Sequence, residues 1–200
     1  KILAIRGRVI PSTLNKVKLV AEFEDGTRVI GEAKIPDKNV PISNVYLTPP
    51  DSQPTRDAIQ AIQEADIIVL GPGSLYTSVI PNLLVKGIAV EIVAARVPKI
   101  YICNVMTQAG ETDNYTAYDH IKALISHTHK NIINTCIVNV AQAPRELLGR
   151  YEKEKSFPVV ADSERIRELG YRVIEERLIS VMDYLRHDPV KLSQIIVGIL

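Results

Sequence analysis

Short apolar runs of strand length dominate the first fifty positions of the chain. These runs cover residues 2–10, 17–23, 27–35 and 40–47. An Asp25-Gly26 pair lies between the second and third runs, and Asp-Gly in such a place is a strong signal for a β-hairpin. The pattern therefore predicts a small antiparallel unit, with residues 12–50 as a β-rich subregion.

After residue 54 the rhythm changes, because stretches with helical spacing alternate with short continuous apolar runs. Helical spacing covers 55–65, a stretch that starts at Ser74, 88–95, 116–127, 146–154, 163–169 and 189–200. Continuous apolar runs cover 66–70 and 99–105, and their β-branched residues are typical of strands buried on both faces. Residues 132–140 are also strand-like. Strands that alternate with helices form βαβ units, so the predicted fold class is α/β with a mostly parallel sheet.

Composition and charge narrow the class of protein. The chain has 200 residues, of which 46% are hydrophobic and 24% charged, and its formal net charge is +1. These values are typical of one globular domain, expected here to span residues 1–200, and near-neutral charge argues against a nucleic-acid-binding surface. Apolar runs stay well below the ~18 residues of a membrane span, so we expect none.

The two cysteines predict no special chemistry. Two cysteines are too few for a disulfide framework, which favours a reducing compartment. Cys103 and Cys136 both lie in strand-like runs, so we expect buried, inert thiols.

The loop at residues 71–78 follows a predicted strand, and open α/β sheets bind ligands beyond the carboxyl ends of their strands. Its glycines allow a sharp turn, and the amides and dipole of the helix that starts at Ser74 favour an anion such as phosphate. The loop matches neither the GxGxxG fingerprint nor the P-loop. A tight turn in which Ser74 merely caps the helix is an equally weighted alternative.

A second polar loop, residues 104–116, follows the next predicted strand and should lie beside the first. Its amides and hydroxyls donate and accept hydrogen bonds in defined directions, as recognition of a base or sugar requires. The alternative is a long polar loop whose end at Thr116 caps the following helix. If the two loops lay far apart, the chain would read as an α/β scaffold that acts through protein contacts alone.

The remaining polar residues favour structural roles. His120 and His127 share one helix face, but no carboxylate or thiol lies at ligand spacing, so we expect surface or satisfied histidines and no metal site. Asp188 followed by Pro189 is a sufficient cap for the last helix. Arg186, just before that cap, could instead reach an anionic or carbonyl group of a ligand.

Read as whole motifs, residues 70–84 (LGPGSLYTSVIPNLL) and 102–112 (ICNVMTQAGET) resemble the bacterial gluconeogenesis factor (YvcK) family. That family is itself similar to 2-phospho-L-lactate transferase (CofD). The shorter segments RGRVIP, EDGT and LRHD fit the same family in the same order. The resemblance implies a Rossmann-like, three-layer fold. It also implies that the family's first βα unit and its glycine-rich GGGTG turn, about the N-terminal third, are missing from this chain.

The resemblance also implies a function. Members bind a nucleotide sugar, typically a UDP-sugar such as UDP-N-acetylglucosamine, and act in the cytoplasm in growth on gluconeogenic carbon and in cell shape, with support for peptidoglycan synthesis. No reaction is established for that branch, so we expect no cofactor and name no catalytic residue. The alternative is a transferase of the 2-phospho-L-lactate type that acts on a phosphorylated small molecule. The sequence leaves the choice between monomer and homodimer open.

The two loops and the resemblance together define a candidate ligand-binding set. Arg186 matches the arginine that the family uses for the UDP-sugar. The full set is Gly71, Gly73, Ser74, Tyr76, Thr77, Ser78, Asn104, Met106, Thr107, Gln108, Gly110, Glu111, Thr112 and Arg186.

Overall fold

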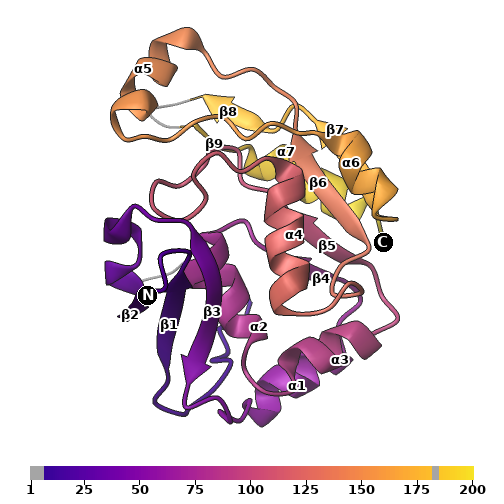
Figure 1. Cartoon of the computed structure of the whole chain (residues 1–200). Helices are drawn as coiled ribbons and strands as arrows, with labels where there is room; N and C mark the ends of the chain where they lie inside the picture. The colour runs from indigo at the N-terminus through magenta and orange to yellow at the C-terminus, as the bar shows by residue number, and fades with distance from the viewer. Residues whose placement is uncertain (1–6, 182–184) are drawn as a thin grey trace.

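The computed structural model describes residues 7–181 and 185–200 (Figure 1). Most of the strand expected at residues 2–10 falls outside the described residues, and residues 7–10 form no strand. The small antiparallel sheet follows, in the order β2-β1-β3. Its strands are β1 (Lys18–Phe23), β2 (Arg28–Ile30) and β3 (Ile42–Thr48).

The predicted hairpin joins β1 to β2. Gly26 adopts a φ of 79°, and the Asp25 carboxylate accepts a hydrogen bond from the Thr27 amide at 2.9 Å. The returning strand was expected to run to residue 35, but it ends at Ile30. Gly31, with a φ of 99°, turns the chain into two short 3-10 helices, η1 (Glu32–Lys34) and η2 (Pro36–Lys38).

A four-stranded parallel sheet in the order β4-β5-β6-β7 forms the centre of the molecule. Its strands are β4 (Ile68–Leu70), β5 (Lys99–Ile102), β6 (Thr135–Asn139) and β7 (Arg172–Glu176). Three of them coincide with the predicted strand-like runs, which confirms the α/β class. β7 was not predicted, because charged residues at both of its ends leave Val173 and Ile174 as its apolar pair.

The expectation of burial on both faces holds for β5 but is wrong for β4. All four residues of β5 are buried. β4 is an edge strand, and the side chain of Val69 is 36% exposed.

The helices fall close to the stretches with helical spacing. They are α1 (Arg56–Gln63), the π-helical turn η3 (Leu75–Val79), α2 (Ile80–Leu83), α3 (Ile88–Ala94), α4 (Ala117–His127), α5 (Arg145–Lys153), α6 (Ser163–Glu168) and α7 (Pro189–Val197). Asp188 caps α7 through the Val190 and Lys191 amides, as predicted. A short hairpin of β8 (Ile179–Val181) and β9 (Leu185–His187), not predicted, precedes α7.

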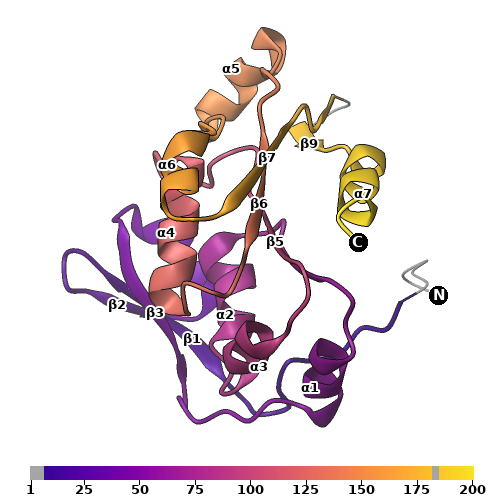
Figure 2. The same ribbon diagram turned by 90° about the vertical axis from the view of Figure 1, so that its right-hand side faces the viewer.

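The elements form layers around the parallel sheet. Figure 2 shows α4 and α6 on one side of β5, β6 and β7, with α7 on the other. Side chains alternate accordingly: Tyr101 and Cys136 join the larger core with α4 and the small antiparallel sheet, whereas Ile100 and Ile137 join a second core with Leu192 of α7. Cys103 and Cys136 are free and buried, as predicted, and burial raises the pKa of both thiols.

No single helix in the described ranges is long and apolar enough to cross a membrane. The segments Leu75–Leu83 and Ile88–Ala94 meet the length and apolarity criteria only as a pair, and they are bent by 76°.

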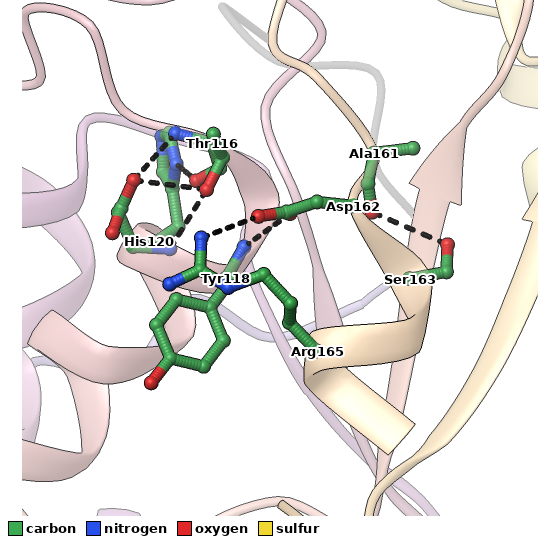
Figure 3. A network of polar contacts seen from close by, with 8 residues as sticks. Thr116, Tyr118, His120, Ala161, Asp162, Ser163 and Arg165 are labelled. Atoms are coloured by element: carbon green, nitrogen blue, oxygen red, sulfur yellow. Dashed lines mark hydrogen bonds and ion pairs between the residues drawn. The ribbon is translucent and has the colours of Figure 1, made fainter. Parts of the chain in front are cut away.

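The start of α4 is held by a polar network that reaches α6 (Figure 3). Thr116 and Asp119 form a capping box. The Asp162 carboxylate accepts from the Tyr118 amide at 2.9 Å and pairs with Arg165 at 3.2 Å, and the Arg165 guanidinium lies 3.8 Å from the centroid of the Tyr118 ring. Asp162 therefore fixes the N-terminal end of one helix against the next.

We predict that Asp162→Ala lowers the free energy of unfolding by about 1–2 kcal/mol, because it removes the acceptor of the Tyr118 amide and the partner of Arg165. Asp162→Asn keeps an oxygen for the amide and should cost about half as much. Urea unfolding of the three proteins measures both effects. Equal midpoints for the wild type and the Ala variant would contradict this role.

Candidate functional site

The two polar loops lie side by side at the carboxyl edge of the parallel sheet, as the order of the strands predicted. Together with β9 and the start of α7 they enclose a cavity of about 600 Å³. The residues that line it are Pro72, Gly73, Asn104, Val105, Met106, Leu185, Arg186, His187, Pro189 and Leu192. The two loops therefore meet at one cavity, as both the nucleotide-sugar hypothesis and the transferase hypothesis require.

Asn104 joins the loops directly. Its side-chain nitrogen donates to the Gly73 carbonyl at 3.0 Å, and its side-chain oxygen accepts from the Gly73 amide at 3.4 Å. Gly71 makes this approach possible, since its φ is 81° and a Cβ there would lie 3.1 Å from the Ile102 carbonyl oxygen. The glycine-rich turn thus sits directly against the end of β5.

Glu111 joins the loops a second time, away from the cavity wall. Its side chain is only 3% exposed, and its Oε1 accepts from the Thr77 hydroxyl at 2.9 Å and from the Gln108 side chain at 2.7 Å. Its Oε2 is buried and has no hydrogen-bond partner among the described residues. Burial raises the pKa of Glu111, while the Thr77 hydroxyl and the amides of Tyr76 and Thr77 act in the opposite direction. The chain's own carboxyl group therefore occupies the start of η3, where the sequence predicted an external anion or a plain cap.

Tyr76 belongs to the core. Its hydroxyl lies 2.7 Å from that of Tyr115, and its ring meets the His127 ring edge-on with centroids 5.6 Å apart. Burial raises the pKa of Tyr76. Ser74 makes no side-chain capping bond, so the simple N-cap alternative is wrong.

The second loop is tied down along most of its length. The Thr107 hydroxyl accepts from the Phe157 amide at 2.9 Å, and the buried Thr112 hydroxyl accepts from the Gln108 amide at 2.9 Å. Gly110 packs against the backbone of Pro36 in η2. In these contacts the polar groups of the loop bond to other parts of the protein. This part of the loop therefore holds the site in shape from outside the cavity wall.

The candidate set thus divides in two. Its members in the cavity wall are Gly73, Asn104, Met106 and Arg186. The members outside the wall are Gly71, Ser74, Tyr76, Thr77, Ser78, Thr107, Gln108, Gly110, Glu111 and Thr112. The candidate set includes the apolar Met106, but it leaves out Pro72 and Val105 in the same loops and Leu185, Pro189 and Leu192 beyond them. It also leaves out His187, for which the adjacent Arg186 was the available signal.

Arg186 and His187 reach the cavity from β9. Their position is set by pairing with β8, in which Arg186 lies opposite Ser180 and His187 opposite Ile179. The His187 Nε2 donates to the Cys103 carbonyl at 3.1 Å, which ties β9 to the end of β5. Burial lowers the pKa of His187.

The helix histidines serve the fold. His127 donates from Nδ1 to the Ala123 carbonyl at 2.7 Å and accepts at Nε2 from the Val45 amide at 3.1 Å. His120 is fully buried, and its Nε2 has no hydrogen-bond partner in residues 7–181 and 185–200, so it is neither a surface nor a fully satisfied histidine there. Across the described residues, no group of three or more His, Cys, Asp or Glu side chains is arranged to hold a metal ion.

The sequence profile of the family described as 2-phospho-L-lactate transferase CofD matches residues 1–179. The chain belongs to the CofD family. Within it, this CofD-family chain is 45% identical over 201 residues to a protein named "Gluconeogenesis factor" from Bacillus subtilis, and 44% identical over 197 residues to one of the same name from Halalkalibacterium halodurans. The alignments cover 100% and 98% of this chain, but only 63% and 61% of those relatives.

A crystal structure of a Bacillus halodurans protein has the same fold. It superimposes with a TM-score of 0.94 at 44% sequence identity, over 98% of this chain and 63% of that chain. The Rossmann-like arrangement of this CofD-family chain is therefore shared with a solved relative.

We predict that Gly110→Ala destabilises the protein by about 3 kcal/mol, since a Cβ there would overlap the Pro36 carbonyl group, 2.6 Å from its carbon, at a φ of 77°. Gly26→Ala is the matched control, because its φ is 79° but its Cβ would meet nothing within 4 Å. Its cost should stay near 1 kcal/mol. Thermal and urea unfolding give both values, and equal losses would refute the packing role of Gly110.

We also predict that acid weakens the fold below about pH 6.5, the ordinary pKa of histidine. Burial lowers the pKa of His120, His127 and His187, so the unfolded chain binds protons before the folded one does, and the free energy of unfolding falls with falling pH. The raised pKa of Glu111 has the opposite effect on the free energy of unfolding, which it increases as the pH falls.

Urea unfolding between pH 7.5 and 5.5 tests this directly. His120→Leu should reduce the slope of stability against pH, whereas His129→Leu, at an exposed histidine, should not. The Glu111 contribution is common to both variants and cancels in the comparison. A slope that is unchanged in His120→Leu would contradict the assignment.

Proposed function

We propose that the protein binds a nucleotide sugar, a UDP-sugar such as UDP-N-acetylglucosamine, in the cavity at the carboxyl edge of the sheet. The observation that carries this proposal is the convergence of the loops after β4 and β5 with Arg186 on one cavity of about 600 Å³. Cavities of this volume accommodate small organic ligands. Their position beyond the carboxyl ends of neighbouring parallel strands is the usual ligand position in open α/β sheets.

The chemistry of the wall suits such a ligand. The Arg186 guanidinium pairs with the diphosphate, because its planar fork matches phosphate oxygens. Val105, Leu185 and Leu192 supply apolar surface for the faces of a base or sugar ring. The near-neutral overall charge fits recognition by one arginine and backbone groups better than by a broad basic surface.

In the cell, we extend the proposal to a cytoplasmic role in growth on gluconeogenic carbon and in cell shape. The name of the relatives, gluconeogenesis factor, supports the proposed role in growth on gluconeogenic carbon. The chain spans 63% and 61% of the length of those two relatives, and we propose that a further segment of the kind that they carry contributes to the nucleotide site. Binding is therefore measured with the full-length protein.

A second candidate is transfer of a phosphorylated small molecule, which the description of the CofD family favours. It is tested by incubating the full-length protein with Mg²⁺, a nucleotide-linked donor and flavin-type acceptors. Formation of product would replace the binding role by a transferase. The absence of product, together with measured UDP-sugar binding, favours the first proposal.

Isothermal titration with UDP-N-acetylglucosamine is expected to give saturable binding, and Arg186→Ala should weaken it about tenfold, or about 1.4 kcal/mol. Arg172→Ala, at the opposite edge of the sheet, is the matched control and should bind like the wild type. No binding of UDP-sugars by the full-length wild type would refute the proposal. Equal losses in the two variants would show a general charge effect.

A further inference from the structure

Among the described residues, the polar side chains in the wall of the cavity are those of Asn104, Arg186 and His187. Both ends of the Asn104 amide are already bonded to the Gly73 backbone. A guanidinium only donates hydrogen bonds, so Arg186 offers no acceptor. Within the described part of this wall, His187 is therefore the side chain whose acceptor atom makes no other hydrogen bond.

The tautomer of His187 follows from its one hydrogen bond. A carbonyl oxygen can only accept, so the Nε2 that lies 3.1 Å from the Cys103 oxygen carries the hydrogen. The Nδ1 of the neutral ring then presents a lone pair. Within the described part of the chain no group donates to this atom, and it is not among the buried side-chain atoms without a partner, so solvent reaches it.

We infer that His187 is a specificity-determining residue of this cavity, whose Nδ1 accepts a hydrogen bond from an N–H or O–H group of the ligand. The inference rests on the proposed nucleotide-sugar binding and names the chemistry that this wall selects: the imide N–H of uracil or a sugar hydroxyl. Much of the surrounding wall is apolar, through Val105, Leu185 and Leu192. A ligand with an acceptor at this point is rejected, because two lone pairs then face each other without a proton.

The position of the ring makes the acceptor dependent on pH. Burial lowers the pKa of His187, and the bond to the Cys103 carbonyl acts in the opposite direction. In the described part of the chain, the charged residues adjacent to it in sequence are Arg186 and Asp188. Lys191 follows on α7, and its ammonium donates to the Arg177 carbonyl at 3.4 Å. Among the described residues, no charged side chain contributes to the shift. Protonation turns Nδ1 into a donor, which repels the donor of the ligand.

Two substitutions separate the role of Nδ1 as an acceptor from the role of Nε2, whose bond to the Cys103 carbonyl anchors the side chain. His187→Gln keeps an N–H near the position of Nε2, so the bond to the Cys103 carbonyl survives, but it leaves no acceptor near Nδ1. His187→Asn loses the anchor but carries a carbonyl oxygen near the position of Nδ1. A residue that merely positions β9 would tolerate Gln better than Asn, whereas an acceptor would tolerate Asn better than Gln.

Isothermal titration of the full-length protein with UDP-N-acetylglucosamine at pH 7.5 tests this order. His187→Gln should weaken binding about tenfold, and His187→Asn should stay within about threefold of the wild type. As the pH is lowered stepwise from 7.5, the wild type should lose affinity where His187 takes up a proton, and His187→Gln should not show this loss. Circular dichroism checks that the variants are folded.

UDP and N3-methyluridine diphosphate distinguish the sources of the donor. If the donor is the imide, the wild type binds UDP better than its N3-methyl analogue, and His187→Gln binds both equally. If the donor is a ribose hydroxyl, the wild type binds UDP and its N3-methyl analogue equally, and His187→Gln binds both more weakly. If the donor is a hydroxyl of the N-acetylglucosamine, the wild type and His187→Gln bind UDP equally and differ only for UDP-N-acetylglucosamine.

Folded variants that bind UDP-N-acetylglucosamine as tightly as the wild type would overturn the inference and leave the proposed function standing. So would a Gln variant that is less impaired than Asn, or a pH dependence that Gln does not change. A full-length wild type that binds neither UDP nor UDP-N-acetylglucosamine refutes the proposed function, and this inference falls with it.

Discussion

Two hydrogen bonds between the Asn104 side chain and the backbone of Gly73 hold the cavity open in its observed shape. They link the turn after β4 to the turn after β5, so neither loop can move without the other. The contact depends on Gly71, whose left-handed backbone and missing side chain let the turn lie against the Ile102 carbonyl. The parallel pairing of β4 with β5 brings these turns to the same edge of the sheet. On the third side of the cavity, the bond from His187 to the Cys103 carbonyl ties β9 to the end of β5.

The small antiparallel sheet takes part in this arrangement because it supports the second loop and α4 from the outside. Its β3 donates through the Val45 amide to His127 of α4, and Pro36 of η2 packs against Gly110. Behind the wall, Glu111 accepts from the first loop through Thr77. Many of the polar side chains that look like ligand groups in the sequence thus satisfy one another inside the molecule, as buried polar groups generally do. This leaves a mainly apolar wall with a few polar groups to define specificity.

Much of the fold could be predicted from hydrophobic spacing, because burial of one helix face or of a continuous strand leaves its period in the sequence. The Asp25-Gly26 hairpin, the run that became β5 and the Asp188 cap are local patterns of this kind. β7 could not be found in this way, since its charged ends hide a two-residue apolar centre whose partner is β6. The exposure of Val69 was equally hidden, because an edge strand and a central strand can carry the same apolar run.

By itself, the sequence determined the α/β class, the order of the elements and the two loops that follow neighbouring strands. These properties depend on spacing along the chain and on the preference of each residue for a turn, helix or strand. Only the tertiary structure decided which loop residues face the cavity, because that depends on contacts between distant segments. Glu111 turned inward because Thr77 lies across from it, and His187 faces the cavity because the Cys103 carbonyl takes its N–H. No periodicity in the chain records such pairs, which exist only once the sheet has brought its edges together.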